Sequence, residues 1–243
     1  MNGKAVLVTG GSRGIGAAIA LAVAEAGADV AITYAANEVA AKEVVRRIEA
    51  IGRRGVAVRA DAGDVGDAAG AVHWAVQTLG RLDVLVNNAG VGVLGPLAGL
   101  TLADVDRVLA VNVRGVFLAS QAAADHMGEG GRIITIGSCM TQRVPGPGGT
   151  LYAMSKSALT GLTKALAREL GGRGITANIV HPGPVDTDMN PAGGPHADPQ
   201  AAMTALGRFG RSEEVAATVA FLAGDGAAYI TGSEFSVDGG HAA

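Results

Sequence analysis

Short segments rich in Val, Ile and Leu alternate with longer segments along almost the whole chain. The short segments are apolar throughout, as strands buried on both faces are. The longer ones repeat apolar residues at spacings of three and four, which is typical of helices. This alternation predicts an α/β fold with one doubly wound parallel sheet of about seven strands and helices on both faces. The predicted strands are 4–9, 29–34, 55–60, 83–87, 131–137, 174–180 and 234–237, and the predicted helices are 14–26, 38–51, 67–79, 101–127, 151–170 and 212–223.

The size and composition suit one domain over residues 1–243, because 49% of the residues are apolar and can form a large core. No apolar run reaches the ~18 residues needed to cross a bilayer, and the segment before the first predicted strand is too short for a signal peptide. Cys139 is the only cysteine, which excludes an internal disulfide and favours a reducing compartment. The net charge of −3 gives no overall attraction to nucleic acid or to an anionic membrane. We therefore expect a cytoplasmic protein with no nucleic-acid and no membrane partner.

One long stretch interrupts the alternation between the sixth strand and the helix at 212–223. It contains about thirty residues and is rich in Pro and Gly. A loop of this length inside a compact domain is usually functional. We predict a substrate lid near 190–206, with a short helix at 201–206.

A glycine-rich loop, Thr9 to Gly16, connects the first predicted strand to the first predicted helix. Its glycines follow the spacing Gly-x-x-x-Gly-x-Gly, at Gly10, Gly14 and Gly16. Glycines let the backbone approach a pyrophosphate closely, and the helix N-terminus offers free N–H groups and a partial positive charge. The loop therefore predicts a Rossmann-type dinucleotide site at this end of the sheet.

Polar motifs follow the ends of the later strands. They are Asn87-Asn88-Ala89-Gly90 after strand four, Asn112 in the next helix, Ser138 after strand five, Tyr152 and Lys156 as Tyr-x-x-x-Lys at a helix start, and Pro182 to Thr187 after strand six. Ligands of open parallel sheets bind at these carboxyl ends. Together with the glycine loop, and in this order, the motifs resemble those of the short-chain dehydrogenase/reductase family over essentially the whole chain.

The resemblance implies a catalytic set of Asn112, Ser138, Tyr152 and Lys156. Tyr152 would be the general acid/base, and the Lys156 ammonium one helical turn away would lower its pKa from about 10. Ser138 would hydrogen-bond the substrate oxygen. Asn112 would hold a water molecule that passes protons to Lys156, which would also hold the nicotinamide ribose.

The resemblance also implies the cofactor contacts, with Asp61 at the adenine and no metal site. The expected cofactor-binding residues are Gly10, Ser12, Arg13, Gly14, Ile15, Gly16, Tyr34, Asp61, Asn88, Ala89, Gly90, Tyr152, Lys156, Pro182, Gly183, Val185 and Thr187.

The end of the second predicted strand bears on which nicotinamide is used. NAD-selective sheets of this type carry an acid there that binds the adenosine ribose. The corresponding position is Tyr34, and no acid occurs before Glu38. Arg13 in the glycine loop can bind a 2′-phosphate as a charge-assisted fork. We therefore predict NADPH/NADP⁺ as the cofactor.

These residues imply an NADP(H)-dependent oxidoreductase that reduces a ketone or aldehyde to an alcohol, with 3-oxoacyl and β-keto ester compounds among the candidate substrates. The alternative is a regulatory nucleotide-binding protein of the cyclic-dinucleotide-binding, biofilm-dispersal type on the same fold. The motif from Pro182 to Asp188 and the interval of fourteen residues between Ser138 and Tyr152 also resemble that type. Small residues on helices 101–127 and 151–170 allow close helix contacts across an interface, and the resemblance implies a homotetramer, with a dimer as the second choice.

Overall fold

The computed structural model describes all residues from Met1 to Ala243. Seven parallel strands form one sheet in the order β3-β2-β1-β4-β5-β6-β7. This confirms the predicted fold class, and every strand boundary falls within two residues of its expected place. The strands are β1 (Ala5–Val8), β2 (Asp29–Tyr34), β3 (Gly55–Arg59), β4 (Val84–Asn87), β5 (Arg132–Ile136), β6 (Thr176–Pro182) and β7 (Glu234–Val237).

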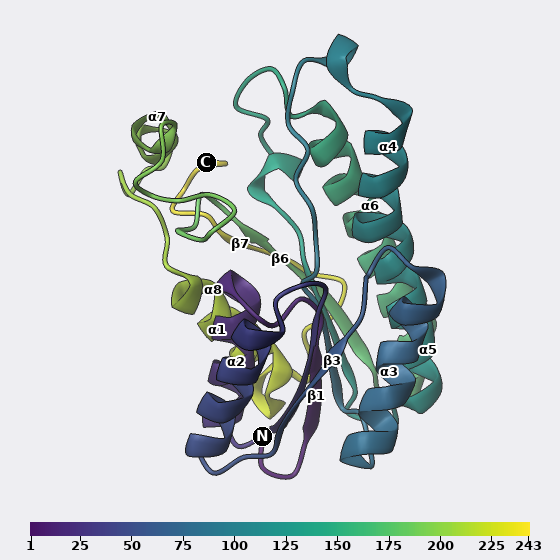
Figure 1. Ribbon diagram of the computed structural model, residues 1–243. Helices are drawn as coiled ribbons and strands as arrows, with labels where there is room; N and C mark the ends of the chain where they lie inside the picture. Colours follow the sequence, from purple (N-terminus) through teal and green to yellow (C-terminus); the bar gives the residue numbers. More distant parts are fainter.

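Helices cover both faces of this sheet (Figure 1). One face carries α1 (Gly14–Glu25), α2 (Glu38–Ala50) and α8 (Ser212–Ala223). The other face carries α3 (Val65–Leu79), α4 (Leu102–Leu109), α5 (Val116–His126) and α6 (Thr150–Leu170). No helix is both long enough and apolar enough to span a membrane.

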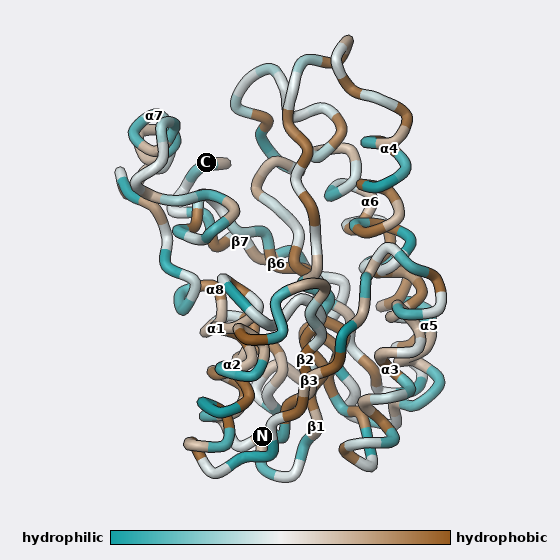
Figure 2. Tube along the Cα trace, in the orientation of Figure 1, coloured by the Kyte–Doolittle hydropathy of each residue, from teal (hydrophilic) through white to brown (hydrophobic).

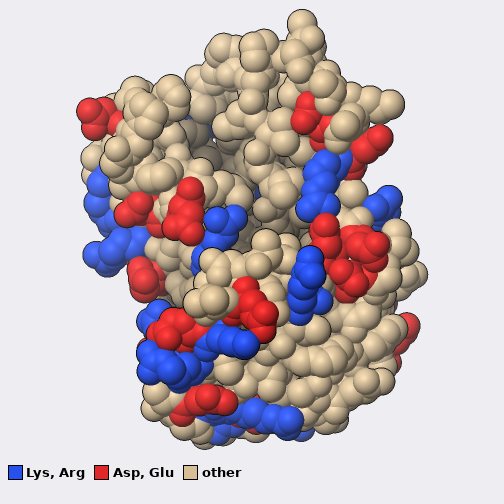
Figure 3. Space-filling model, viewed as in Figure 1, with Lys and Arg blue, Asp and Glu red and all other residues tan.

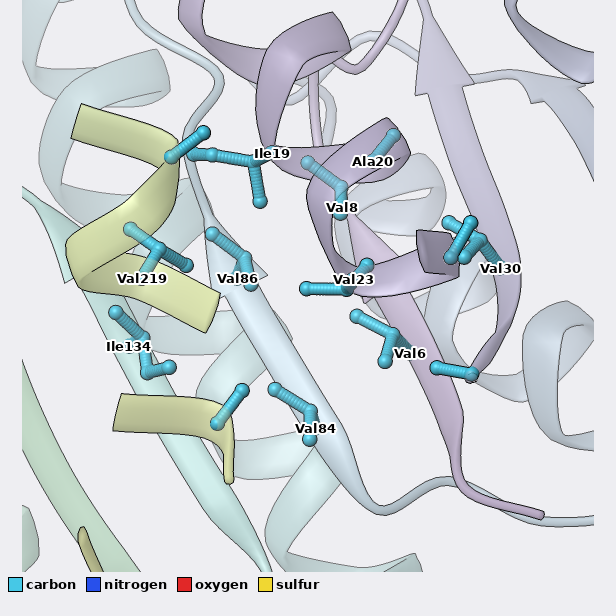
Figure 4. Close-up of a cluster of buried hydrophobic side chains, with 14 of the residues drawn as sticks. Val6, Val8, Ile19, Ala20, Val23, Val30, Val84, Val86, Ile134 and Val219 are labelled. Carbon is cyan, nitrogen blue, oxygen red and sulfur yellow. The ribbon is translucent and has the colours of Figure 1, made fainter. Parts of the chain in front are cut away.

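The core consists of two layers, one on each side of the strands. Figure 4 shows the first layer, in which Val6 and Val86 from the sheet meet Ile19 and Val23 of α1 and Val219 of α8. Figure 2 shows the same pattern along the chain, with brown segments in the sheet and teal ones on the outer turns. Each buried Val, Leu or Ile contributes about 1.5–3 kcal/mol to the stability of the fold.

The strand order reverses between β1 and β4, because β1 pairs with β2 on one side and with β4 on the other. Such a switch point leaves a crevice beyond the carboxyl ends of the strands. The glycine loop after β1 and the Asn-Asn-Ala-Gly motif after β4 both start there. The fold therefore brings the motifs from both halves of the chain to one edge of the sheet.

Two predicted helices differ from the structure. The segment 101–127 is not one regular helix, because a π-helical turn, Ala110–Gly115, separates α4 from α5. The expected lid helix at 201–206 is instead α7, Ala197–Ala202. It ends early because the Thr204 hydroxyl accepts a hydrogen bond from Arg208 N, and Leu206 N donates to Gly239 O instead of continuing the helix.

Candidate active site

The loop between β1 and α1 depends on the absence of side chains. Gly10 and Gly14 have positive φ angles of 64° and 51°, which other residues adopt only with strain. A Cβ atom on Gly10 would lie 3.0 Å from the Cα atom of Ala89. A Cβ atom on Gly16 would collide with the Gly10 carbonyl and the Asn88 amide. The expected glycines are therefore required by close packing of backbone against backbone.

Neighbouring strands hold this loop in place. Gly10 N donates to Thr33 Oγ1 and Gly11 N donates to Thr33 O, both over 2.9 Å. On the other side, Asn88 Nδ2 donates to Thr9 O at 2.9 Å and to Gly10 O at 3.1 Å. The side-chain amide of Asn88, which was expected at the adenosine, thus holds the glycine loop in place.

The N-terminus of α1 lacks the side-chain cap that α2, α3 and α4 have. Asn37 caps α2, Asp64 caps α3 and Thr101 caps α4, whereas Arg13 before α1 makes no such bond. Its first turn also contains no acidic residue. Free N–H groups and the helix dipole favour an anion at this point. The glycine loop and the uncapped helix therefore fit the diphosphate of a dinucleotide.

The end of β2 presents cations and no carboxylate. Tyr34 pairs in register with Arg59 of β3, and Arg59 Nε donates to Ala35 O over 3.1 Å. Arg13 is exposed, and its guanidinium lies 3.6 Å from Asp188 Oδ2. An exposed pair of this kind is weak, so Arg13 stays free to bind a phosphate. Arg59 was not predicted from the sequence, because only strand pairing brings it beside Ala35.

Asp61, the expected adenine contact, is already bound to another side chain. Arg107 Nη1 donates to both of its carboxylate oxygens, at 3.0 and 3.1 Å, and Gly63 N donates to Oδ1 at 2.9 Å. The hydrogen bond from Arg107 is the main reason why the pKa of Asp61 is lowered. Arg107, which the sequence did not suggest, therefore sets the orientation of this carboxylate.

Asn112 lies fully buried in the π-helical turn. Its Oδ1 accepts from Val91 N at 2.9 Å, while its Nδ2 donates to Val91 O at 2.9 Å and to Ser155 Oγ at 3.0 Å. Both amide hydrogens are used, so Asn112 fastens the loop after β4 to α6. At the Asn112 side chain, only the second lone pair of Oδ1 remains to accept a hydrogen bond from the water molecule that the sequence suggested.

Ser138 and Tyr152 are brought together at the end of β5. Ser138 precedes a 3₁₀ turn, Cys139–Thr141, and its Oγ accepts from Met140 N at 3.2 Å. Burial raises the pKa of the Tyr152 phenol, and a hydrogen bond with the Ser138 side chain partly offsets this effect. Burial dominates in the protein chain alone, and the lowering expected from Lys156 together with the oxidised nicotinamide stays a prediction.

Lys156 is a buried amine on α6. Its Nζ donates to Ile136 O at 2.9 Å, and burial lowers its pKa to about 8. A Cβ atom on Gly90 would lie 3.4 Å from both Lys156 Nζ and Asn112 Oδ1. These two side chains therefore converge on Gly90, where an added Cβ atom would contact both of them.

The segment after β6 joins the chemical end to the phosphate end. Gly183 packs on the backbone of Asp238, and Val185 forms a β-bridge with Gly210. Thr187 reaches back to the glycine loop, where a Cβ atom on Gly14 would lie 3.3 Å from its Cγ2. The segment that begins at Pro182 therefore spans the interval in which the nicotinamide half of a dinucleotide is expected.

Three segments surround the catalytic side chains, and they are nearly free of cations. The loop after β4 bonds to the loop before α6 through Gly95 N and Gly148 O at 2.9 Å. The segment after β6 contributes Met189, whose Sδ would lie 3.9 Å from a Cβ atom on Gly92. Residues 88–103, 139–151 and 187–207, which we call the rim, contain one Lys or Arg, Arg143. Figure 3 shows that charged side chains are sparse at the top of the molecule, between α7 and α4.

His181 and Glu234 form a polar pair near Ser138 that the sequence did not predict, in which His181 is buried and Glu234 is exposed. His181 is fully buried on β6, with one ring nitrogen near Ser138 N and the other near Glu234. In the sequence, only the position of His181 directly before Pro182 pointed weakly to the site. Nothing in the sequence pointed to Glu234, because it lies 53 residues from His181 along the chain.

The comparisons with known proteins agree with this geometry. A family model described as enoyl-(acyl carrier protein) reductase matches residues 10–242. The chain is 46% identical to the cyclic-di-GMP-binding biofilm dispersal mediator protein of Escherichia coli K12, over 98% of this chain and 96% of that protein. It is 41% identical to a 3-oxoacyl-[acyl-carrier-protein] reductase of Synechocystis, over 99% of this chain and 97% of that protein.

One solved structure is very similar over the full length. A short-chain dehydrogenase from Burkholderia cenocepacia J2315, crystallised in complex with NADP, superimposes with a TM-score of 0.99 at 55% identity, covering 100% of this chain and 99% of that chain. These matches confirm the resemblance seen in the sequence motifs. The chain therefore belongs to the short-chain dehydrogenase/reductase family.

Proposed function

We propose that this protein uses NADPH to reduce an uncharged, largely apolar ketone or aldehyde to an alcohol. The observation that carries the proposal is that the Ser138 hydroxyl lies beside the buried Tyr152 phenol, next to a rim that contains only one Lys or Arg. NADPH, when bound, supplies the hydride that is added to the carbonyl carbon. The protein must then stabilise the negative charge that develops on the carbonyl oxygen and supply a proton to it.

Each polar side chain has a distinct part in this task. The Tyr152 hydroxyl donates its proton to the carbonyl oxygen, which is why a raised pKa in the protein chain suits the reductive direction. Ser138 Oγ donates a hydrogen bond to the same oxygen and stabilises its charge. Lys156 places a cation below Tyr152 and stabilises the phenolate that remains. Asn112 holds the loop after β4 against α6 and so positions Lys156.

The phosphate end supports NADPH over NADH. Backbone N–H groups at the start of α1 bind the diphosphate, and Arg13 binds the 2′-phosphate. The segment from Tyr34 to Asn37 has no carboxylate that would repel this phosphate. The cofactor of the Burkholderia structure is NADP, which supports the same choice.

The rim favours one of the substrate classes that the relatives suggest. A carrier-linked acyl group and a cyclic dinucleotide both bring phosphates, which proteins bind with Arg, Lys or helix N-termini. Arg143 is the only Lys or Arg of the rim, and its Nη1 donates to His241 O at 2.9 Å. Exposed apolar side chains dominate instead, with Leu94 at 68%, Met189 at 58% and Leu206 at 65% of full exposure. An apolar substrate is therefore favoured.

A matched pair of ketones tests this proposal. Ethyl 3-oxobutanoate and the 3-oxobutanoate anion share the reacting group and differ in charge. We expect kcat/KM with NADPH to be at least about tenfold higher for the neutral ester, and Tyr152→Phe to remove the activity on both. Equal turnover of the two compounds, or a strong preference for the anion, would contradict the proposed substrate class.

Binding of cyclic di-GMP tests the regulatory alternative. Calorimetry should detect NADPH binding and no competing cyclic di-GMP binding at micromolar concentration. Tight binding of the cyclic dinucleotide together with no ketone turnover would replace the enzyme by a binding protein.

A further inference from the structure

His181 has hydrogen-bond partners that fix the position of its proton. The backbone N–H of Ser138 donates to His181 Nδ1 at 3.2 Å, so Nδ1 must be unprotonated. The ring proton therefore lies on Nε2, which donates to Glu234 Oε2 at 3.2 Å. Glu234 in turn pairs with Lys164 Nζ at 2.8 Å. The neutral ring thus links a surface lysine, through a carboxylate, to the backbone of Ser138.

The packing around the ring is close on the Ser138 side. A Cβ atom on Gly137 would collide with His181 Nδ1, so a glycine is required beside the ring. Thr141 Oγ1 lies 3.3 Å from Nδ1 and donates its hydrogen to Ser138 O at 2.9 Å. The ring and Thr141 therefore hold the N–H and the C=O of the same residue, whose side chain faces Tyr152.

Protonation of Nδ1 would change these partners. A protonated Nδ1 can no longer accept from Ser138 N, so two N–H groups would face each other. It could donate to Thr141 Oγ1, which has free lone pairs. The Ser138 N–H would then be a buried donor without a partner, which costs about 1–3 kcal/mol. The backbone at Ser138 must shift to relieve this cost.

We propose that His181, supported by Glu234, is a positioning residue for Ser138, and that the backbone of Ser138 is held in its reactive place only while the ring is neutral. This inference rests on the proposed function for its effect on catalysis, but its structural part does not. Nothing in it requires the imidazole to touch substrate or cofactor.

The charges around the ring determine where this change occurs. Burial lowers the pKa of His181 below 6.5, and the Glu234 carboxylate on β7 partly offsets that effect. Lys156 of α6 adds a small lowering, and Lys164 of α6 acts through Glu234. Because the pKa is lowered, the neutral ring persists at pH 7 and is lost only in acid. We therefore expect kcat to fall as the pH drops through the pKa of His181.

Nuclear magnetic resonance on the whole protein tests the structural part. The imidazole signals of His181, one of five histidines, are identified by their loss in His181→Gln. We expect the Nε2–H tautomer at pH 7.5, and an amide shift at Ser138 with the same midpoint as the ring. A Ser138 amide that does not change with the ring would overturn the proposal, whether or not the protein reduces ketones.

Three variants test the catalytic part. His181→Gln retains an acceptor and a donor but does not titrate, so it should keep kcat within about threefold at pH 7.5 and lose the acid limb. Glu234→Gln should move the limb to lower pH by about half a unit or more, because the imidazolium loses its counter-charge. Lys164→Gln, the matched control, should move it slightly to higher pH. If all variants keep the acid limb of the parent protein, His181 has a merely structural role.

A variant without an acceptor gives the size of the effect. His181→Leu should lower kcat by about tenfold while the KM for NADPH stays unchanged, because only Ser138 loses its support. If this variant fails to fold, the pH profiles of Glu234→Gln and Lys164→Gln, which leave the ring in place, still decide the matter. Shifts in the same direction for both would overturn the proposal.

Discussion

The phosphate end and the chemical end of the site lie at the same sheet edge but are built in opposite ways. The phosphate end uses backbone and removes side chains: Gly10, Gly14 and Gly16 sit where a Cβ atom would meet Ala89, Thr187 or Gly10 itself. The chemical end places polar side chains in the interior, where Lys156 and His181 are buried and Tyr152 is desolvated. The first arrangement is intolerant of added atoms, whereas the second depends on its polar side chains for its proposed function.

The largest effect is expected at the chemical end, from Tyr152→Phe. Removal of the general acid should lower kcat by about two orders of magnitude or more, whereas NADPH affinity, measured by fluorescence titration, should change little. Tyr229→Phe is the control, because Tyr229 is fully exposed and far from any described contact of the site. If Tyr152→Phe reduced ketones as fast as the parent protein, Tyr152 would not be the acid.

At the phosphate end, Gly16→Ala should be the most damaging single change. The added methyl group meets the Gly10 carbonyl and the Asn88 amide, which are held by their own hydrogen bonds. We expect NADPH affinity to fall by more than about tenfold and the free energy of unfolding to fall by about 1–3 kcal/mol.

Gly70→Ala on α3 is the matched control, since its Cβ atom would enter open space. It should raise stability by about 0.5–1 kcal/mol, because alanine is the better helix former. Equal effects of the two changes on stability would show that close packing does not explain Gly16.

Replacement of Lys156 at the chemical end should increase the stability of the folded protein even though it abolishes the proposed activity. The lowered pKa of Lys156, about 8 instead of 10.5, means that the folded state disfavours the ammonium. Lys156→Met should therefore raise the free energy of unfolding at pH 7 by about 1–3 kcal/mol.

The pH dependence gives the sign of this effect. Between pH 8 and 10.5 the unfolded chain binds more protons at this lysine than the folded one, so the parent protein gains stability as the pH rises. The advantage of Lys156→Met should thus be complete below pH 8 and shrink toward pH 10. Denaturant unfolding at pH 7, 8.5 and 10 measures it, and an advantage that grows with pH would contradict burial as the cause.

The smallest effect is expected from Arg13→Ala at the phosphate end. Loss of one exposed guanidinium should reduce a preference for NADPH over NADH of about tenfold, equivalent to about 1.4 kcal/mol, to near unity. NADH kinetics should hardly change. Lys42→Ala on α2 removes an exposed cation that pairs with Glu38 and is the control. If Arg13→Ala keeps the preference for NADPH, Arg59 and not Arg13 is the residue that binds the 2′-phosphate.

Local patterns explain why most of the fold could be predicted. The strands and the main helices were expected within about two residues, because apolar periodicity and glycine punctuation are local properties. The π-helical turn around Asn112 could not be seen, because its residues keep the same spacing of three and four. The lid helix was misplaced because the contacts that end it, at Arg208 and Gly239, lie outside the segment.

What the sequence by itself determined is therefore the order of the chemical groups along the chain: a glycine loop after the first strand, Ser138 after the fifth strand, and Tyr152 and Lys156 at the start of the next helix. What only the tertiary structure decided is how these groups are supported and charged. Arg107 reaches Asp61 across 46 residues, and Glu234 reaches His181 across 53. Such pairs leave no local signal, because parallel strands bring together side chains that are separated by whole βα units. Burial, which lowers the pKa of Lys156 and raises that of Tyr152, likewise exists only once the two faces of the sheet are covered.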